Sequence, residues 1–231
     1  MKEIEFIAKN EFVWNVWEKP RPASNFIPDW WKKMSSGDEI KDLDPTLSLT
    51  VKKCMPTIDL LSAGYIVTLA ADIKVNIDES GKHYAQWFDQ IPILGVWSEY
   101  QVSNFEVLEE YNTRPVFKYS HGWNIKTPSG WSCYFTHPVG HQNLPFRTIA
   151  GMVDTDLLKT EINVPFVFKK GWTGVLEKGT PMFQIIPFER NSWKAKYSFI
   201  TETQHSYNVG VLHTKLKDSY KKYFREKRSY T

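Results

Sequence analysis

Short apolar runs separated by proline or glycine are the feature that most limits the folds open to this chain of 231 residues. From residue 100 onward these runs lie at 100–107, 115–119, 131–135, 162–168, 182–188 and 195–201. Many short runs at fairly even spacing, divided by turn residues, are typical of strands in a sandwich or barrel-like β-domain. We therefore expect a mainly β protein.

The earlier part of the chain fits the same class. Residues 65–77 predict a strand, and the turn signal at 78–81 (Asp-Glu-Ser-Gly) predicts that 83–87 return as the second arm of a hairpin. Residues 47–51 alternate with a period of two, which also predicts a strand. Residues 28–34 predict a short helix, because proline suits its first position and aspartate suits its first turn.

Three segments organise the chain in this interpretation. An N-terminal extension, 1–50, packs on a β-domain, 51–205, and a basic amphipathic helix, 206–231, follows. The apolar side chains expected on one face of that helix are Leu212, Leu216, Tyr220 and Tyr223. Its lysines and arginines form either a solvated helix face or a surface for an anionic partner.

Composition excludes several classes of protein. A net charge of +3 is too small to predict nucleic-acid binding. The two cysteines, Cys54 and Cys133, cannot form a disulfide framework or a four-thiolate zinc site. Residues 1–5 contain no apolar signal core, and no run approaches the roughly 18 apolar residues of a membrane span. We therefore expect a soluble, cytoplasmic protein that contacts no membrane.

Four short motifs occur in a fixed order. They are Ser-Ala-Gly-Tyr at 62–65, Thr-Pro-Ser-Gly-Trp at 127–131, Ala-Gly-Met-Val-Asp-Thr-Asp at 150–156 and Gly-Thr-Pro-Met-Phe-Gln-Ile-Ile at 179–186. The acid Asp154 falls between a glycine turn and the next apolar run. A site assembled from separate turns and strands would draw on all four motifs.

The order of these motifs, over roughly 60–190, resembles the dUTPase and dCTP deaminase superfamily, whose fold is the β-clip. That family has an Ala-Gly-Tyr-Asp element, a turn before a phosphate loop, a Gly-x-Ile-Asp-x-Asp-Tyr element and a Gly-x-x-x-x-Gln-Leu strand. The resemblance places Asp154 where the dUTPases hold the acid that orders the attacking water and contacts the sugar. It matches Gln184 to the strand glutamine, and it implies a homo-oligomer, with a trimer favoured.

The chain also departs from this pattern. Ile66 stands where the family has an acid, and Leu157 stands where it has a tyrosine. The phosphate-loop arginine is replaced by His-Pro-Val-Gly at 137–140, and the glycine-rich, arginine-bearing C-terminal arm is missing. Triphosphate chemistry needs cations and backbone N–H groups around the developing charge. The departures argue against dUTP hydrolysis.

A ligand site is predicted from these matches. Asp154 would act as a general base or contact a sugar, and His137 and His141 would meet an anionic end. The other residues assigned to ligand binding are Ser129 and Gly130 as backbone donors, Trp131 as a stacking platform, and Gln184. Asp154 could instead cap a turn, and Gln184 could instead bond backbone within the sheet.

The three histidines His121, His137 and His141 raise the question of a metal site. On a Pro-Gly loop the His-x-x-x-His spacing loses its helical geometry, so we expect no metal, and the sequence leaves the question of a cofactor open. The function expected from the sequence is binding of a nucleotide-like or small anionic ligand, with catalysis undecided. The alternatives are a residual nucleotide pyrophosphatase or deaminase, and a non-enzymatic structural protein.

The structural alternative has a second source. The composition and the segment 27–33 (Ile-Pro-Asp-Trp-Trp-Lys-Lys) resemble uncharacterised proteins of tailed bacteriophages. Phages use β-clip domains both as nucleotide enzymes and as capsid-decorating proteins. A phage-encoded chain would act in the host cytoplasm or in the virion.

Overall fold

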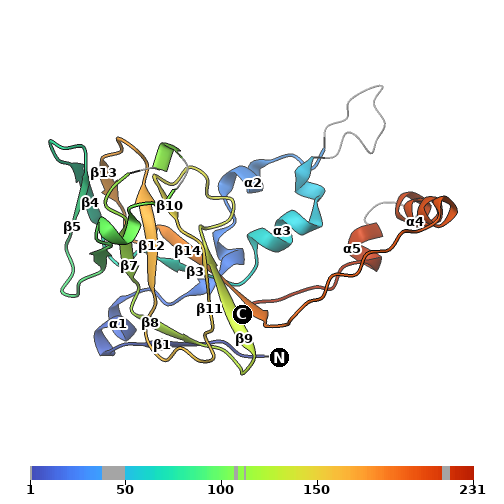
Figure 1. Cartoon of the computed structure of the whole chain (residues 1–231), viewed down its shortest axis with the longest axis horizontal. Helices are drawn as coiled ribbons and strands as arrows, with labels where there is room; N and C mark the ends of the chain where they lie inside the picture. The colour runs from blue at the N-terminus through green and yellow to red at the C-terminus, as the bar shows by residue number, and fades with distance from the viewer. Residues whose placement is uncertain (1, 38–49, 107–108, 112, 215–218) are drawn as a thin grey trace. The chain divides into compact units, whose positions relative to one another are not determined.

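The computed structural model describes residues 2–37, 50–106, 109–111, 113–214 and 219–231 (Figure 1). The chain divides into two compact units. The first unit holds residues 1–29, 61–190 and 230–231. The second holds 30–60 and 191–229.

Fourteen short strands among the described residues confirm the prediction of a mainly β protein. They are β1 (Glu5–Ala8), β2 (Arg21–Pro22), β3 (Tyr65–Thr68), β4 (Ile73–Ile77), β5 (His83–Trp87), β6 (Leu94–Val96), β7 (Phe117–Ser120), β8 (Trp123–Lys126), β9 (Trp131–Thr136), β10 (Phe146–Thr148), β11 (Gly151–Val153), β12 (Asn163–Phe168), β13 (Gly174–Leu176) and β14 (Pro181–Glu189). All of their pairings are antiparallel.

These strands form sheets of two, three, four and five strands. The five-stranded sheet has the order β11-β9-β14-β3-β2, and the four-stranded sheet has the order β10-β12-β7-β6. The smaller sheets are β13-β4-β5 and β1-β8. The long strand β14 lies between β9 and β3, so it joins the segments that carry three of the sequence motifs.

Aromatic side chains build the core of the first unit. Phe117, Phe166 and Phe168 pack ring against ring, with centroids 5.2–5.7 Å apart. Tyr119 is also buried, and its hydroxyl donates to the carbonyl of Thr68 at 2.9 Å and accepts from the N–H of Ala70 at 2.9 Å. The high aromatic content therefore fills the space between sheets, and this tyrosine finds the polar partners that burial demands.

Gly64 explains why the first motif needs a glycine. Its φ of +67° lies in the left-handed region, and a Cβ on it would meet the carbonyl oxygen of Ile185 at 1.8 Å. The turn before β3 thus passes too close to β14 for any side chain. The glycine lets these two strands pair.

The local predictions have mixed outcomes. The hairpin is confirmed, since β4 and β5 pair around the turn at 78–81, and α2 (Asp29–Lys33) confirms the short helix. The single strand predicted over 65–77 is wrong: β3 and β4 belong to different sheets, because β3 pairs with β14 whereas β4 pairs with β5 and β13. The strand predicted at 100–107 is also wrong in its described part, where a 3-10 helix, η3 (Tyr100–Val102), occurs.

The helices and remaining 3-10 turns are short. They are α1 (Glu11–Val16), η1 (Ala23–Phe26), η2 (Val51–Lys53), α3 (Met55–Leu61), η4 (Glu109–Tyr111), α4 (Glu202–Thr214) and α5 (Ser219–Tyr223). The strand predicted at 47–51 falls mostly outside the described residues, and its last residue begins η2. Among the described residues, no helix combines the length and apolar character needed to cross a membrane.

The second unit carries the C-terminal helices. Its parts 30–60 and 191–229 are joined by an ion pair, in which Arg225 Nε donates to Asp59 Oδ2 at 2.8 Å. The boundary expected at 206 falls inside α4, and Leu216 lies outside the described residues. Tyr220 and Tyr223 are 41% and 61% exposed.

The last two residues return to the first unit. The rings of Tyr230 and Tyr65 meet edge to face with centroids 6.0 Å apart, and the Tyr65 hydroxyl donates to the backbone oxygen of Thr231 at 3.2 Å. Burial and the neighbouring Tyr230 raise the pKa of Tyr65. The stretch 191–229 is therefore bounded on both sides by residues of the first unit.

Candidate functional site

The predicted site residues fall at the two ends of strand β9. Ser129, Gly130 and Trp131 lie at its start, with Asp154 hydrogen-bonded nearby, whereas His137 follows its end. The strand has six residues, which corresponds to a length of about 20 Å. The structure therefore divides the predicted site into two clusters rather than bringing it into one cavity.

Arg190 and Asp156 organise the cluster at the start of β9. Arg190 Nη1 and Nη2 donate to the two carboxylate oxygens of Asp156 at 2.5 and 2.6 Å, and Nη1 also donates to Ser132 Oγ at 3.1 Å. The Asp156 side chain is only 4% exposed. Hydrogen bonding from Arg190, aided by the Gly130 N–H, lowers the pKa of Asp156 to about 2 against the opposing effect of burial. This pair is a rigid link rather than a titrating acid at neutral pH.

The turn before β9 uses its backbone donors within the protein. The N–H of Gly130 donates to Asp156 Oδ2 at 2.8 Å, and the N–H of Trp131 donates to the carbonyl of Pro128 at 3.1 Å. The carbonyl of Gly130 in turn accepts from the N–H of Arg190 at 2.8 Å. In this structure the turn is tied to β14 and to the segment after β11, and these two N–H groups point at protein acceptors.

Asp154 differs from its neighbour in exposure. Its side chain is 56% exposed, and its Oδ1 accepts from Ser132 Oγ at 2.7 Å and lies 3.3 Å from Arg190 Nη1. Two carboxylates, Asp154 and Asp156, therefore surround one guanidinium, which leaves the local charge negative. A negative cluster disfavours an anionic ligand and suits one with hydroxyl or amine donors.

Trp131 is half-buried, and one of its faces carries a cation from the N-terminal segment. The Nζ of Lys2 lies 4.2 Å from the centroid of the indole. A planar ligand that stacked on this face would have to displace the lysine. Sequence reasoning singled out the tryptophan but not the lysine.

The cluster after β9 is enclosed. His137 is 5% exposed; its Nε2 lies 3.1 Å from the carbonyl of His141, and its Nδ1 accepts from the N–H of Thr148 at 3.3 Å. These partners fix a neutral ring with its proton on Nε2, and burial lowers the pKa of His137 to about 4. His141 Nε2 lies 2.8 Å from the carbonyl of Phe26. Both histidines hold loops together in this way.

Gln184 occupies the centre of the same cluster. It is 1% exposed; its Oε1 accepts from the N–H of Val139 at 3.0 Å, and its Nε2 donates to the carbonyl of Ala63 at 2.7 Å. The amide therefore connects β14, the loop after β9 and the first motif. These contacts match the alternative in which the Gln184 side chain bonds to backbone groups rather than to a ligand.

The remaining predictions concern metal binding and the two apolar departures from the family pattern. His121 is buried, with its pKa lowered to about 3 by desolvation, and no group of three or more metal-ligating side chains occurs within the described residues. Ile66 is buried in β3, at 2% exposure, whereas Leu157 is 67% exposed on the surface. Ile66 therefore belongs to the core, whereas Leu157 does not.

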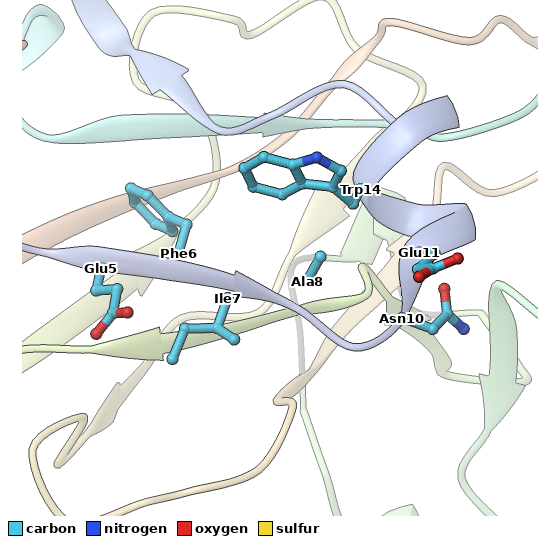
Figure 2. A pocket seen from close by; sticks show the side chains of 7 residues that line it. All are labelled: Glu5, Phe6, Ile7, Ala8, Asn10, Glu11 and Trp14. Atoms are coloured by element: carbon cyan, nitrogen blue, oxygen red, sulfur yellow. The ribbon is translucent and has the colours of Figure 1, made fainter.

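A surface groove lies elsewhere, along β1 and the helix α1. It has a volume of about 350 Å³, and Figure 2 shows the indole of Trp14 lying above the strand beside Phe6. The lining residues are Glu5, Phe6, Ile7, Ala8, Asn10, Glu11 and Trp14. None of the residues predicted for ligand binding lines this groove, and no motif signalled it.

Comparisons with known proteins give structural likeness but no likeness in sequence. No family model matches the chain, and no curated protein matches its sequence. A solved structure of a variant dUTPase from Staphylococcus bacteriophage 80alpha matches with a TM-score of 0.37 at 9% identity. The match covers 87% of this chain and 98% of that one. It concerns the course of the backbone and assigns no residue a role.

Proposed function

We propose that this chain is a non-enzymatic structural protein that assembles with further copies of itself. The observation that carries this proposal is the exposure of three large aromatic side chains in one short segment. Trp193, Tyr197 and Phe199 are 90%, 91% and 94% exposed. Aromatic side chains gathered on a surface are typical of protein interfaces.

The use of the polar groups supports the same proposal. The carboxylate of Asp156, the N–H of Gly130 and the amide of Gln184 all bond within the protein. The guanidinium of Arg190 is shared between two carboxylates. Phosphoryl chemistry requires cations and N–H groups that face the substrate, and these groups face one another instead.

The test is the molar mass in solution. Sedimentation equilibrium at micromolar concentration should give a multiple of 27.0 kDa; we expect three copies, as in the family the sequence resembles. Replacing Trp193, Tyr197 and Phe199 together by serine should weaken the assembly. Serine at Phe88 and Tyr100, which are 84% and 91% exposed elsewhere, is the matched control. A single species of monomer mass at every concentration would contradict the proposal.

A second candidate function is binding of a small, nucleoside-like ligand, which carries hydroxyl donors and no phosphate, and the exposure of Asp154 favours it. Its carboxylate is held by Ser132 and Arg190 yet faces solvent, so it is oriented to accept from a hydroxyl. A thermal-shift panel of nucleosides and nucleotides, with and without Mg²⁺, tests this function. A shift that Asp154→Ala abolishes while the fold survives supports it, and the absence of any shift removes it.

A further inference from the structure

The segment 191–200 has the sequence of a strand but no strand partner among the described residues. Trp193, Ala195, Tyr197 and Phe199 alternate with Lys194, Lys196 and Ser198. In an extended chain this alternation places the apolar side chains on one face and the lysines on the other. The structure nevertheless assigns no strand over 191–200, and every one of these residues is exposed. A strand was predicted at 195–201, and that prediction is wrong for the single chain.

Strand β1 also lacks a strand partner, on one of its two edges, within the described residues. Within the described part of the chain it pairs with β8 alone, so its other edge has no neighbouring strand. The groove of about 350 Å³ follows this strand, and the Trp14 side chain, which lies on the same side of the strand as Phe6, is 52% exposed (Figure 2). An unpaired strand edge beside an apolar groove is a template for an added strand.

Charge favours the lysine-bearing segment as the occupant. The groove is lined by two carboxylates, Glu5 and Glu11, and the segment 191–200 carries Lys194 and Lys196 but no acid. Two cations already lie near the groove: Lys126 is 3.4 Å from Glu5, in an exposed pair, and Lys19 lies over the Trp14 ring. An exposed pair of this kind is weak, so the added lysines can compete for Glu5.

We propose that residues 191–200 of one copy add as a strand to the free edge of β1 in a second copy. The aromatic face of the segment covers Phe6 and Trp14, which lie on one side of β1, and the two lysines lie on the other side, with Glu5 (Figure 2). This inference rests on the proposed self-assembly and names the surface that produces it. Each copy carries both the segment and the groove, so the contact closes either as a reciprocal pair or as a ring.

Charge reversal on the two sides tests the contact in the full chain. One variant carries Lys194→Glu and Lys196→Glu, and the other carries Glu5→Lys and Glu11→Lys. Each variant alone should show a dissociation constant raised at least about tenfold by sedimentation, because like charges now face each other. A single chain that carries all four substitutions should recover assembly for any number of copies, since its acidic segment then meets a basic groove in every contact. Lys221→Glu with Lys222→Glu, on α5, is the matched control and should assemble as the wild type does.

The outcomes separate the two proposals. If the wild type and both variants assemble equally, this contact is wrong and self-assembly uses another surface. If the two variants dissociate and the chain with all four substitutions stays dissociated too, the segment does not bind a second copy and the inference is overturned. A wild type that is monomeric throughout overturns both proposals. Circular dichroism of each variant checks that Glu11→Lys, in the first turn of α1, has not unfolded the chain.

Discussion

The guanidinium of Arg190 and the carboxylate of Asp156 meet through two parallel hydrogen bonds, at the point where β14 ends and the segment after β11 begins. The N–H of Gly130 donates to the same carboxylate. Three segments that are distant in sequence are thus fixed to one another by one ion pair. The arrangement has a measurable dependence on pH.

Asp156→Asn should remove a stabilisation that exists only when the carboxylate is charged. The pKa of Asp156 is lowered from 3.8 to about 2 in the folded protein. A lowered pKa means that the contribution is present above the unfolded value and is lost as pH falls through the folded value. The difference in unfolding free energy between wild type and variant should therefore be constant above about pH 4 and shrink toward pH 2. Urea unfolding at several pH values measures it, with Asp154→Asn as the exposed control; a difference independent of pH would contradict the role.

His137→Gln should flatten the acid limb of the stability curve. Burial lowers the pKa of His137 from 6.5 to about 4. Between these pH values the imidazole is therefore protonated in the unfolded chain and neutral in the folded protein. Stability should then fall as pH drops from 6.5 to 4, by up to about 1.4 kcal/mol per pH unit for this proton. The variant should lose that part of the slope and keep the part due to His121. Denaturant unfolding across this range provides the measurement, and His205→Gln, on the exposed face of α4, should keep the wild-type slope.

Gln184→Leu tests whether the buried amide is structural. The substitution leaves the N–H of Val139 and the carbonyl of Ala63 without their partner on Gln184, which should cost about 1–3 kcal/mol. Gln86→Leu, on the exposed side of β5, makes the same chemical change and should stay within about 0.5 kcal/mol of wild type. Chemical unfolding of both variants decides the matter. Equal stabilities for the two variants would show that the amide bonds contribute nothing.

Gly64→Ala and Gly81→Ala separate backbone strain from steric contact. Both glycines have positive φ, +67° and +82°, but a Cβ on Gly81 would meet nothing within 4 Å. Alanine at Gly81 should cost only the left-handed conformation, about 1–2 kcal/mol. Alanine at Gly64 also collides with the Ile185 carbonyl and should cost about 3 kcal/mol or more. Midpoints of thermal unfolding that fell equally in both variants would rule out the close approach of this turn to β14.

The strands that were predicted correctly are those with a strong local signal. β12 is buried over most of its length and β14 from Met182 to Ile185, and both are long apolar runs, so their residues alone indicate a strand. The break between β3 and β4 left no such signal, because Leu69, Ala70 and Ala71 are apolar and buried although they belong to neither strand. An apolar pattern indicates which residues are buried. Here the buried residues continue without a break from a strand of one sheet to a strand of another, so the pattern does not show where the first strand ends.

The site was harder to predict for a different reason. The motif at 150–156 contains two acids, and the sequence alone does not tell which one is buried. The buried acid is Asp156, and its partner Arg190 lies 34 residues away. A lone arginine after a strand carries no signature of its own. Gln184 was weighed in both roles, and its contacts match the backbone-bonding one.

The contact between Tyr230 and Tyr65 makes the stretch 191–229 a closed loop rather than a free tail. The entropy of closing a flexible loop grows only with the logarithm of its length, at about 0.6 kcal/mol for each doubling. Insertions within this stretch should therefore lower the unfolding free energy of the β-sheets very little. A reporter domain inserted between residues 200 and 202, outside the proposed assembly strand and before α4, should leave the first unit folded.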